Sequence, residues 1–128
     1  YRTGNFLFDE AGDIHGVLDW EMAHLGDPLE DLGWSLQPVW CFGREGMAGG
    51  LVPPEQAIAA WERASGLKAD PAALHWWTLF NCVKGQGIWV GSAKAFISGG
   101  NRSPIMVYPA WWLINAQDRA MLKLMGRL

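Results

Sequence analysis

The sequence predicts a mostly helical α+β domain, in which one N-terminal β-hairpin is followed by about four helices. Two observations predict it. Short apolar stretches at residues 5–8 and 14–19 flank the turn cluster DEAGD, whose Gly12 is able to adopt positive φ. After Asp19 the strand pattern stops, and segments led by proline carry apolar residues at helical spacing.

The first helix is expected to begin at Asp27-Pro28. An Asp side chain caps free N–H groups, and a proline at the first helical position loses no hydrogen bond. About three turns are predicted, because four apolar residues then fall on one helical face: Leu29, Leu32, Leu36 and Val39.

Two longer helical segments follow a glycine-rich connector at residues 41–52. Pro53-Pro54 opens the first of them, and Gly66 is a candidate C-cap. Asp70-Pro71 opens the second, which is expected to reach about Ile97 and to end at the Gly99-Gly100 pair. This segment contains Gly85, Gly87 and Gly91, which predict either a kink or a close backbone contact.

The last helix is expected to start at Ser103-Pro104 and to run towards Met125, with a bend near Pro109. No repeat of fixed period links the helices. The sequence therefore predicts one hairpin and four helices in a single unit.

Composition limits the classes of function. The 128 residues carry 10 Lys and Arg against 13 Asp and Glu, a net charge of −3, so no nucleic-acid partner is expected. The longest apolar run, residues 105–114, contains Pro109 and is shorter than the roughly 20 residues of a membrane span. With no secretory pattern ahead of Asn5 and only two cysteines, Cys41 and Cys82, we expect a cytoplasmic protein without membrane partners.

Asn5 and Asp19 are the first candidate site residues. Asn5 lies at the mouth of the first predicted strand and Asp19 at the end of the second, so antiparallel pairing brings their side chains together. Carboxylate and amide oxygens suit Mg²⁺, which prefers oxygen ligands together with waters and phosphates. From the hairpin pattern alone, the two residues either hold a metal or only end their strands.

Three blocks in order resemble the aminoglycoside phosphotransferase and choline kinase superfamily. YRTGN resembles the last five residues of its catalytic loop, GVLDWE its metal-binding strand, and LGDPLEDLGW its Gly-Asp-Pro helix start. The amino-acid sequence of the last two blocks is similar to that of the phosphotransferase-like branch associated with acyl-CoA dehydrogenases. In protein kinases the first two blocks correspond to the catalytic loop and the Asp-Phe-Gly motif.

The resemblance implies a fold, a reaction and cofactors. Residues 1–128 would form part of the C-terminal lobe of a protein-kinase-like fold. Residues 1–20 would be the end of the catalytic loop and the metal-binding hairpin, and residues 27–128 a helical subdomain. The intact protein would be a small-molecule kinase that transfers phosphate from ATP or GTP to a hydroxyl group, with Mg²⁺ as cofactor.

Site roles follow residue by residue from the resemblance. Asn5 and Asp19 would hold Mg²⁺ and the nucleotide phosphates. Arg2 would contact the transferring phosphate or be a solvated loop residue. Glu21 would approach a second metal or be a surface carboxylate.

Three further residues receive supporting roles from the same resemblance. Asp27 would be a helix cap, and Asp31 corresponds to a buried helix Asp that supports the catalytic loop. Trp34, on the helix after the metal strand, is the preferred substrate contact among the tryptophans.

One departure from the family pattern concerns the general base. The Asp of the His-Gly-Asp signature would directly precede Tyr1, and the N-terminal lobe is also outside these residues. The 128 residues alone are therefore expected to be inactive.

The tryptophan pairs and several polar residues leave alternatives open. Two pairs of adjacent tryptophans are present, Trp76-Trp77 and Trp111-Trp112. On a helix, one member of each pair would face the core and the other a groove. The pairs either line an acceptor pocket or belong to ordinary core packing. Lys84 and Gln86 either face an acceptor or lie on a solvated face, and the solvated face is preferred. Arg102 either meets an anionic substrate or is a solvated loop residue, and the latter is preferred. The three histidines, His15, His24 and His75, are expected to be structural.

Two functions remain after these observations. The first is phosphoryl transfer to a small-molecule hydroxyl acceptor, with a hydroxylated metabolite or hydroxyacyl compound preferred over an aminoglycoside. The second is a non-catalytic helical module that binds or oligomerises through an apolar surface, since nine tryptophans accompany the missing catalytic parts.

Overall fold

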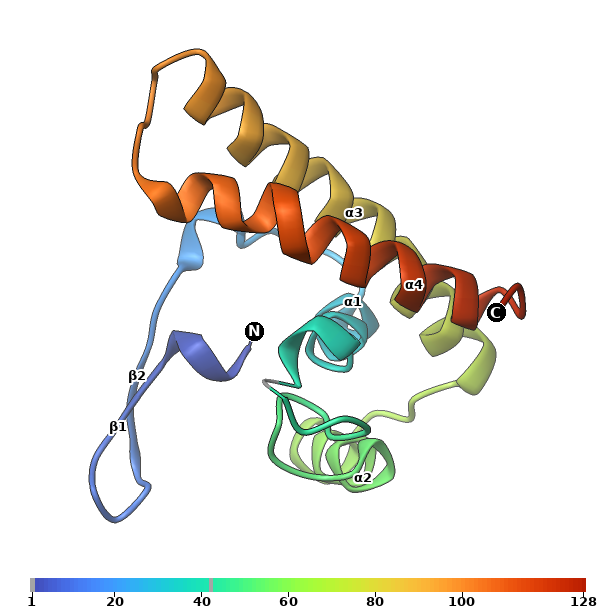
Figure 1. The fold of residues 1–128 in the computed structure, drawn as a ribbon. Helices are drawn as coiled ribbons and strands as arrows, with labels where there is room; N and C mark the ends of the chain where they lie inside the picture. Colours follow the sequence, from blue (N-terminus) through green and yellow to red (C-terminus); the bar gives the residue numbers. More distant parts are fainter. Residues whose placement is uncertain (1, 42) are drawn as a thin grey trace.

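The computed structural model describes residues 2–41 and 43–128. Tyr1 of the YRTGN stretch and Phe42 of the glycine-rich connector lie outside the described residues. Within them the chain forms a two-stranded antiparallel hairpin followed by four α-helices, which confirms the predicted fold class (Figure 1). None of these helices combines the length and the hydropathy that a bilayer crossing requires.

The hairpin extends to one side of the helices (Figure 1). Strand β1 (Phe6–Phe8) pairs with β2 (Ile14–Val17), and a bulge between Leu7 and Phe8 shifts the register. Gly12 in the turn has φ 89°, as the turn cluster predicts. Both strands are shorter than predicted, because Asn5 already belongs to a 3-10 turn and β2 ends two residues before Asp19.

Helix α1 (Pro28–Ser35) begins at the predicted place, where the Asp27 carboxylate accepts a hydrogen bond of 2.9 Å from the Leu29 amide. The prediction of three turns is wrong, because α1 ends at Ser35. Pro38 disfavours helical backbone at Gln37, which is extended with ψ 132°, and Val39 belongs to a separate 3-10 turn.

Helices α2 (Pro54–Ser65) and α3 (Pro71–Ile97) begin and end as predicted. Gly66 caps α2 with φ 72°, and Asp70 caps α3 by accepting from the Ala73 amide. Of the three glycines inside α3, Gly85 makes the predicted close contact, because an added Cβ would lie 3.3 Å from Gln117. Gly87 and Gly91 face open space, so the prediction of a kink or contact is wrong there.

The last helix, α4 (Ile114–Leu124), starts later than predicted. Pro104–Met106 form a 3-10 turn and Pro109–Leu113 a π-helical turn, instead of a continuous α-helix. Pro109 lacks the N–H that would continue an α-helix through this point, which is the reason for the predicted bend. Helices α3 and α4 then run side by side over α1 (Figure 1).

Two apolar clusters hold the helices together. Leu29 and Leu32 of α1 pack on Leu74 of α3, with Ile58 and Trp61 of α2 against them. The second cluster joins the segment after α1 to α3 and the π-helical turn, through Val39, Trp40, Trp89 and Leu113. Because both clusters contain α3, this helix fixes the positions of the others.

A buried polar network lies between these clusters. The Gln37 amide donates to the Thr78 carbonyl at 2.6 Å, and its Oε1 accepts from Gln117 at 2.7 Å and from the Cys82 thiol at 3.2 Å. The side chains of Gln37, Cys82 and Gln117 are almost fully buried. Burial raises the pKa of the Cys82 thiol, so it remains protonated as a donor.

Candidate functional site

Asn5 and Asp19 meet at the base of the hairpin. The Leu18 amide donates to the Asn5 carbonyl at 2.8 Å, which extends the strand pairing by one bond beyond β1 and β2. The side chains continue this contact, since Asn5 Nδ2 donates to Asp19 Oδ2 at 2.9 Å. The structure therefore places a carboxylate and an amide together, as the hairpin pattern predicts, and these two groups could hold a hard cation.

Asp19 has an unusual backbone. Its φ of 70° and ψ of 48° are left-handed, and it is the only non-glycine residue in the described ranges with positive φ. Such a conformation costs about 1–3 kcal/mol and persists only where the surroundings enforce it. The next three residues, Trp20–Met22, form a 3-10 turn, in which the Trp20 indole donates to the Val17 carbonyl at 2.7 Å.

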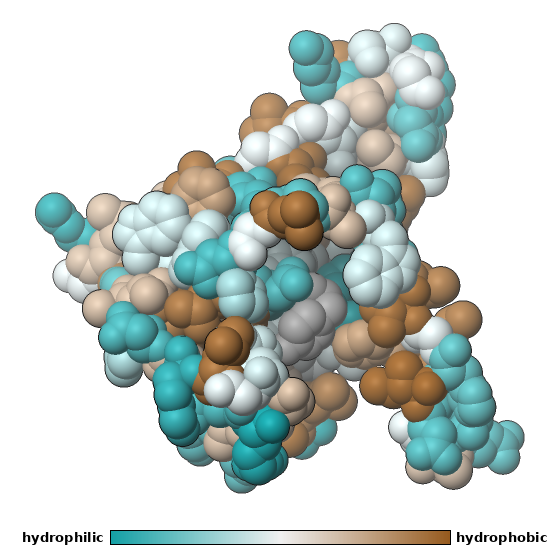
Figure 2. All heavy atoms as spheres, turned by 180° about the vertical axis from the view of Figure 1, so that it is seen from behind, coloured by the Kyte–Doolittle hydropathy of each residue, from teal (hydrophilic) through white to brown (hydrophobic). Residues whose placement is uncertain are grey.

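A cleft of about 2090 Å³ separates the hairpin from the helices. Figure 2 shows the molecule from behind, with the hairpin as a separate arm and apolar residues around the hollow beside it. All the site residues suggested by the sequence line this one cleft: Arg2, Asn5, Asp19, Glu21, Asp27, Asp31 and Trp34.

Aromatic rings and cations occupy the helical side of the cleft. Trp34 packs on Trp40 with ring centroids 5.4 Å apart, and the Arg2 guanidinium lies 5.1 Å from the Trp40 ring centroid. Tyr108 stacks on Trp112 at 5.8 Å. Both Trp111 and Trp112 are exposed, so the prediction that one of this pair faces the core is wrong.

The acidic residues around Asp19 differ in their surroundings. Glu21 is exposed in the 3-10 turn, and no group of three His, Cys, Asp or Glu side chains in the described part of the chain is arranged to hold a metal ion. Asp27 accepts from the Trp77 indole at 3.1 Å besides capping α1. Asp31 is exposed, which contradicts the expected burial, because this position of α1 faces the cleft while Glu30 faces α3.

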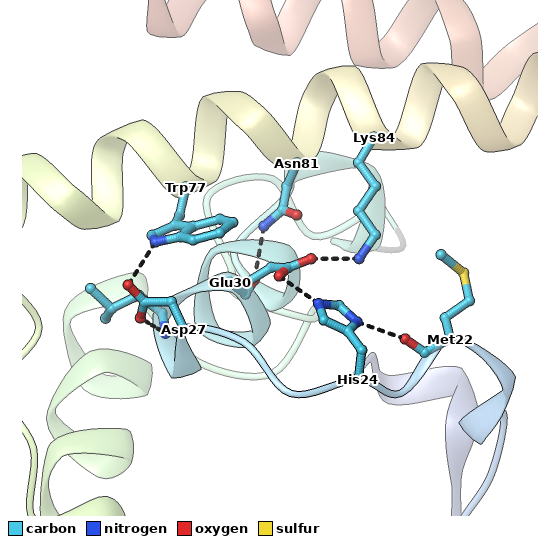
Figure 3. Close-up of polar contacts among 8 residues, drawn as sticks. Met22, His24, Asp27, Glu30, Trp77, Asn81 and Lys84 are labelled. Carbon is cyan, nitrogen blue, oxygen red and sulfur yellow. Dashed lines mark hydrogen bonds and ion pairs between the residues drawn. The ribbon is translucent and has the colours of Figure 1, made fainter.

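Glu30 forms the centre of a charged cluster (Figure 3). Its Oε1 accepts from Lys84 at 2.6 Å, its Oε2 lies 3.0 Å from His24 Nε2, and its side chain is only 11% exposed. His24 Nδ1 lies 3.0 Å from the Met22 carbonyl. Lys84 also lies over the Trp34 ring at 5.8 Å.

The cluster changes the ionisation of its members. Burial alone would raise the pKa of Glu30, but the hydrogen bonds from Lys84 and His24 outweigh it and leave that pKa below its usual value. The contact with the Met22 carbonyl, followed by the bond to Glu30, raises the pKa of His24. Glu30 is therefore a carboxylate held between the Lys84 cation and a histidine whose pKa is raised.

Sequence reasoning missed this cluster. It placed Lys84 and Gln86 on a solvated face, but Lys84 is paired with Glu30 and Gln86 donates to Asp118 at 2.5 Å. One feature of the sequence does indicate a partner: Lys84 lies among apolar residues of a long helix. A lysine at such a position is rarely buried without an acidic partner.

Comparison with known proteins identifies a family for the chain. Residues 1–80 match the family model APH, described as the phosphotransferase enzyme family. No curated protein and no solved structure matches the chain. The matched segment covers more than half of the chain and contains the hairpin, the Asn5–Asp19 pair and the start of α3, and the chain therefore belongs to the phosphotransferase enzyme family.

Proposed function

We propose that the full-length protein transfers a phosphoryl group from a nucleoside triphosphate to a hydroxyl group of a small molecule, with Mg²⁺ as cofactor. The observation that carries this proposal is the contact between Asn5 and Asp19 at the cleft, inside the segment that matches the phosphotransferase family. ATP and GTP both suit the proposal.

The donor set at the hairpin base suits Mg²⁺. Asp19 offers a carboxylate and Asn5 an amide oxygen, and Mg²⁺ is commonly bound by one or two protein oxygens together with waters and phosphates. The Asn5–Asp19 hydrogen bond holds the two side chains side by side, and Asp19 is exposed to the cleft. When bound, the ion would neutralise negative charge on the nucleotide phosphates.

Arg2 and Glu21 have secondary roles in this proposal. The Arg2 guanidinium carries a permanent charge into the cleft wall, where it would contact the transferring phosphate. Glu21 lies on the same wall and would bind a second metal or its water. In the family pattern the general base would precede Tyr1, so the tests below use the full-length protein.

The helical side of the cleft favours a neutral or anionic acceptor. Trp34, Tyr108 and Trp112 provide aromatic surface, and Arg119 and Lys123 provide positive charge. Among the acidic residues after Asp31 that the structure describes, only Glu45 lines the cleft. Asp27, Glu30 and Asp31 also line the cleft, but Asp27 caps α1 and Glu30 is paired with Lys84, so few carboxylates remain to meet the several ammonium groups of an aminoglycoside. A hydroxy acid or hydroxyacyl compound is therefore the better acceptor, in line with the acyl-CoA-dehydrogenase-associated branch.

The test measures nucleotide consumption by the full-length protein with a panel of alcohols, hydroxy acids, hydroxyacyl compounds and aminoglycosides. Asp19→Asn should lower kcat by about 10³-fold or more, since it removes the charged group facing the metal and phosphates. Asp13→Asn in the hairpin turn is the matched control and should keep wild-type activity. Activity in Asp19→Asn close to that of wild type contradicts the metal role.

A second candidate function is association of two copies, and one observation favours it. Five large apolar residues on α3 form a stripe with the spacing of a coiled-coil seam, and all of them are exposed: Trp76, Phe80, Val83, Val90 and Ile97. Light scattering of the full-length protein distinguishes this candidate, because a monomer at high concentration contradicts it.

A further inference from the structure

We propose that Lys84, Glu30 and His24 form a positioning relay, which holds the turn after β2 so that Asp19 faces the cleft. The relay runs from α3 through α1 to the backbone of Met22, three residues after Asp19 (Figure 3). Its consequence for catalysis rests on the proposed function, whereas its effect on the turn does not. None of the three side chains is placed in contact with substrate.

Glu30 is the fixed point of the relay. The Asn81 side chain, which is fully buried, donates to the Glu30 carbonyl at 2.8 Å. One turn later Gly33 packs so closely on α3 that an added Cβ would lie 3.1 Å from the Thr78 backbone nitrogen. Helix α1 is thus anchored on α3 at Glu30 and again one turn after it, so the Glu30 carboxylate has little freedom to move.

His24 transmits this fixed position to the turn. Both of its ring nitrogens face acceptors, the Met22 carbonyl at 3.0 Å and the Glu30 carboxylate at 3.0 Å. A neutral imidazole has only one N–H and would satisfy one of them, whereas the imidazolium donates to both. Glu30 from α1 and Lys84 from α3 are the charged groups that act on the ring.

Gly26 makes room for the ring. A Cβ at this position would lie 3.2 Å from the His24 ring and 3.6 Å from Glu30 Oε2. The glycine of the Leu25-Gly26-Asp27-Pro28 sequence therefore lets the histidine reach Glu30 before the chain turns into the cap of α1. The local sequence thus accommodates the relay.

Asp19 needs support of this kind because its left-handed backbone is strained. On one side it is held to Asn5, directly before the first strand, through the Leu18 amide and the Asn5 side chain. On the other side the 3-10 turn is closed by the Ala23 amide, which donates to the Trp20 carbonyl at 2.9 Å. His24 follows directly and ties this end of the turn to the helices.

The first test compares His24→Ala with His15→Ala in the full-length protein. His15 also pairs with a carboxylate, Asp9 at 2.8 Å, but on the exposed hairpin. The Mg²⁺ concentration for half-maximal rate should rise about tenfold or more in His24→Ala, as for other residues that orient metal ligands. The KM for the acceptor should stay within about twofold, since no acceptor contact is removed. His15→Ala should match wild type in both.

The second test asks whether the cation on α3 is needed. Lys84→Met removes the charge that holds Glu30, and should raise the Mg²⁺ requirement in the same direction as His24→Ala. Lys84→Arg keeps a cation there and should restore most of the wild-type behaviour. Lys68→Met is the matched control, because Lys68, which is exposed in the loop after α2, pairs with Glu62 of α2 at 2.9 Å.

Hydrogen exchange of residues 18–24 gives a measurement that does not depend on activity. Exchange in this segment should be about tenfold faster in His24→Ala and in Lys84→Met, and unchanged in both controls. If the exchange rates are unchanged, or the turn loosens without any change in Mg²⁺ requirement, the positioning role is overturned. If wild type shows no Mg²⁺-dependent activity on any acceptor, the proposed function fails, and hydrogen exchange still decides whether the relay holds the turn.

Discussion

The stability that His24 contributes to this fold depends on whether its side chain is protonated. The fold raises its pKa above the usual 6.5, first through the Met22 carbonyl and then through Glu30. A raised pKa means that the folded state binds the proton more tightly than the unfolded state. The stability that His24 contributes is therefore complete below about pH 6.5 and is lost as the pH rises through the pKa of the folded state.

This predicts a pH-dependent effect of His24→Ala on thermal unfolding. The variant should unfold at a lower temperature than wild type at pH 6, and the difference should shrink towards pH 9 because neutral His24 satisfies only one of its two acceptors. Circular dichroism of the full-length protein measures both midpoints. His75→Ala, on the exposed face of α3, is the control, and a gap of equal size at both pH values contradicts the prediction.

At the scale of elements, the sequence predicts helix starts better than helix ends and contacts. The three helix starts at Pro28, Pro54 and Pro71 are visible because Asp27, Asp70 and the prolines act locally. The end of α1 and the late start of α4 depend on what surrounds Pro38 and Pro109. The Lys84–Glu30 pair joins residues 54 positions apart, and nothing local reveals it. Asn5 and Asp19 were predicted together because a short hairpin joins them.

The glycines of α3 provide a prediction for one element. Gly91→Ala should stabilise the protein by about 1 kcal/mol, because the position is helical, exposed and open, and alanine has the higher helix propensity. Gly85→Ala should gain nothing or lose stability, because its Cβ would meet the buried Gln117 side chain at 3.3 Å. Urea unfolding of the two variants measures the difference, and an equal gain in both contradicts it.

At the scale of the whole molecule, the exposed stripe on α3 predicts the geometry of a dimer. In an antiparallel pair of α3 helices centred between Gln86 and Gly87, Val83 of one copy would lie opposite Val90 of the other, and Trp76 opposite Ile97. A contact of this kind is self-complementary, as a two-fold interface must be. The stripe lies on the face of α3 that the other described helices leave exposed.

Val83→Glu tests this arrangement. The charge should shift the full-length protein from dimer to monomer in light scattering, because a carboxylate would be buried in the seam without a partner. Leu51→Glu is the control, since Leu51 is exposed to a similar extent, 58% against 56% for Val83, but lies in the connector before α2. A wild-type monomer, or an unaffected dimer in Val83→Glu, excludes pairing through α3.

The buried amides of Gln37 and Gln117 determine the register of the last helix. Apolar side chains alone allow α4 to slide along α3 by a turn at little cost, since one leucine or alanine packs much like another. A slide by one turn would remove the 2.7 Å hydrogen bond between these amides and leave the buried Gln117 side chain without that partner. The network thus selects one alignment of α4 among several of similar hydrophobic burial, and with it the placement of Arg119 and Lys123 along the cleft.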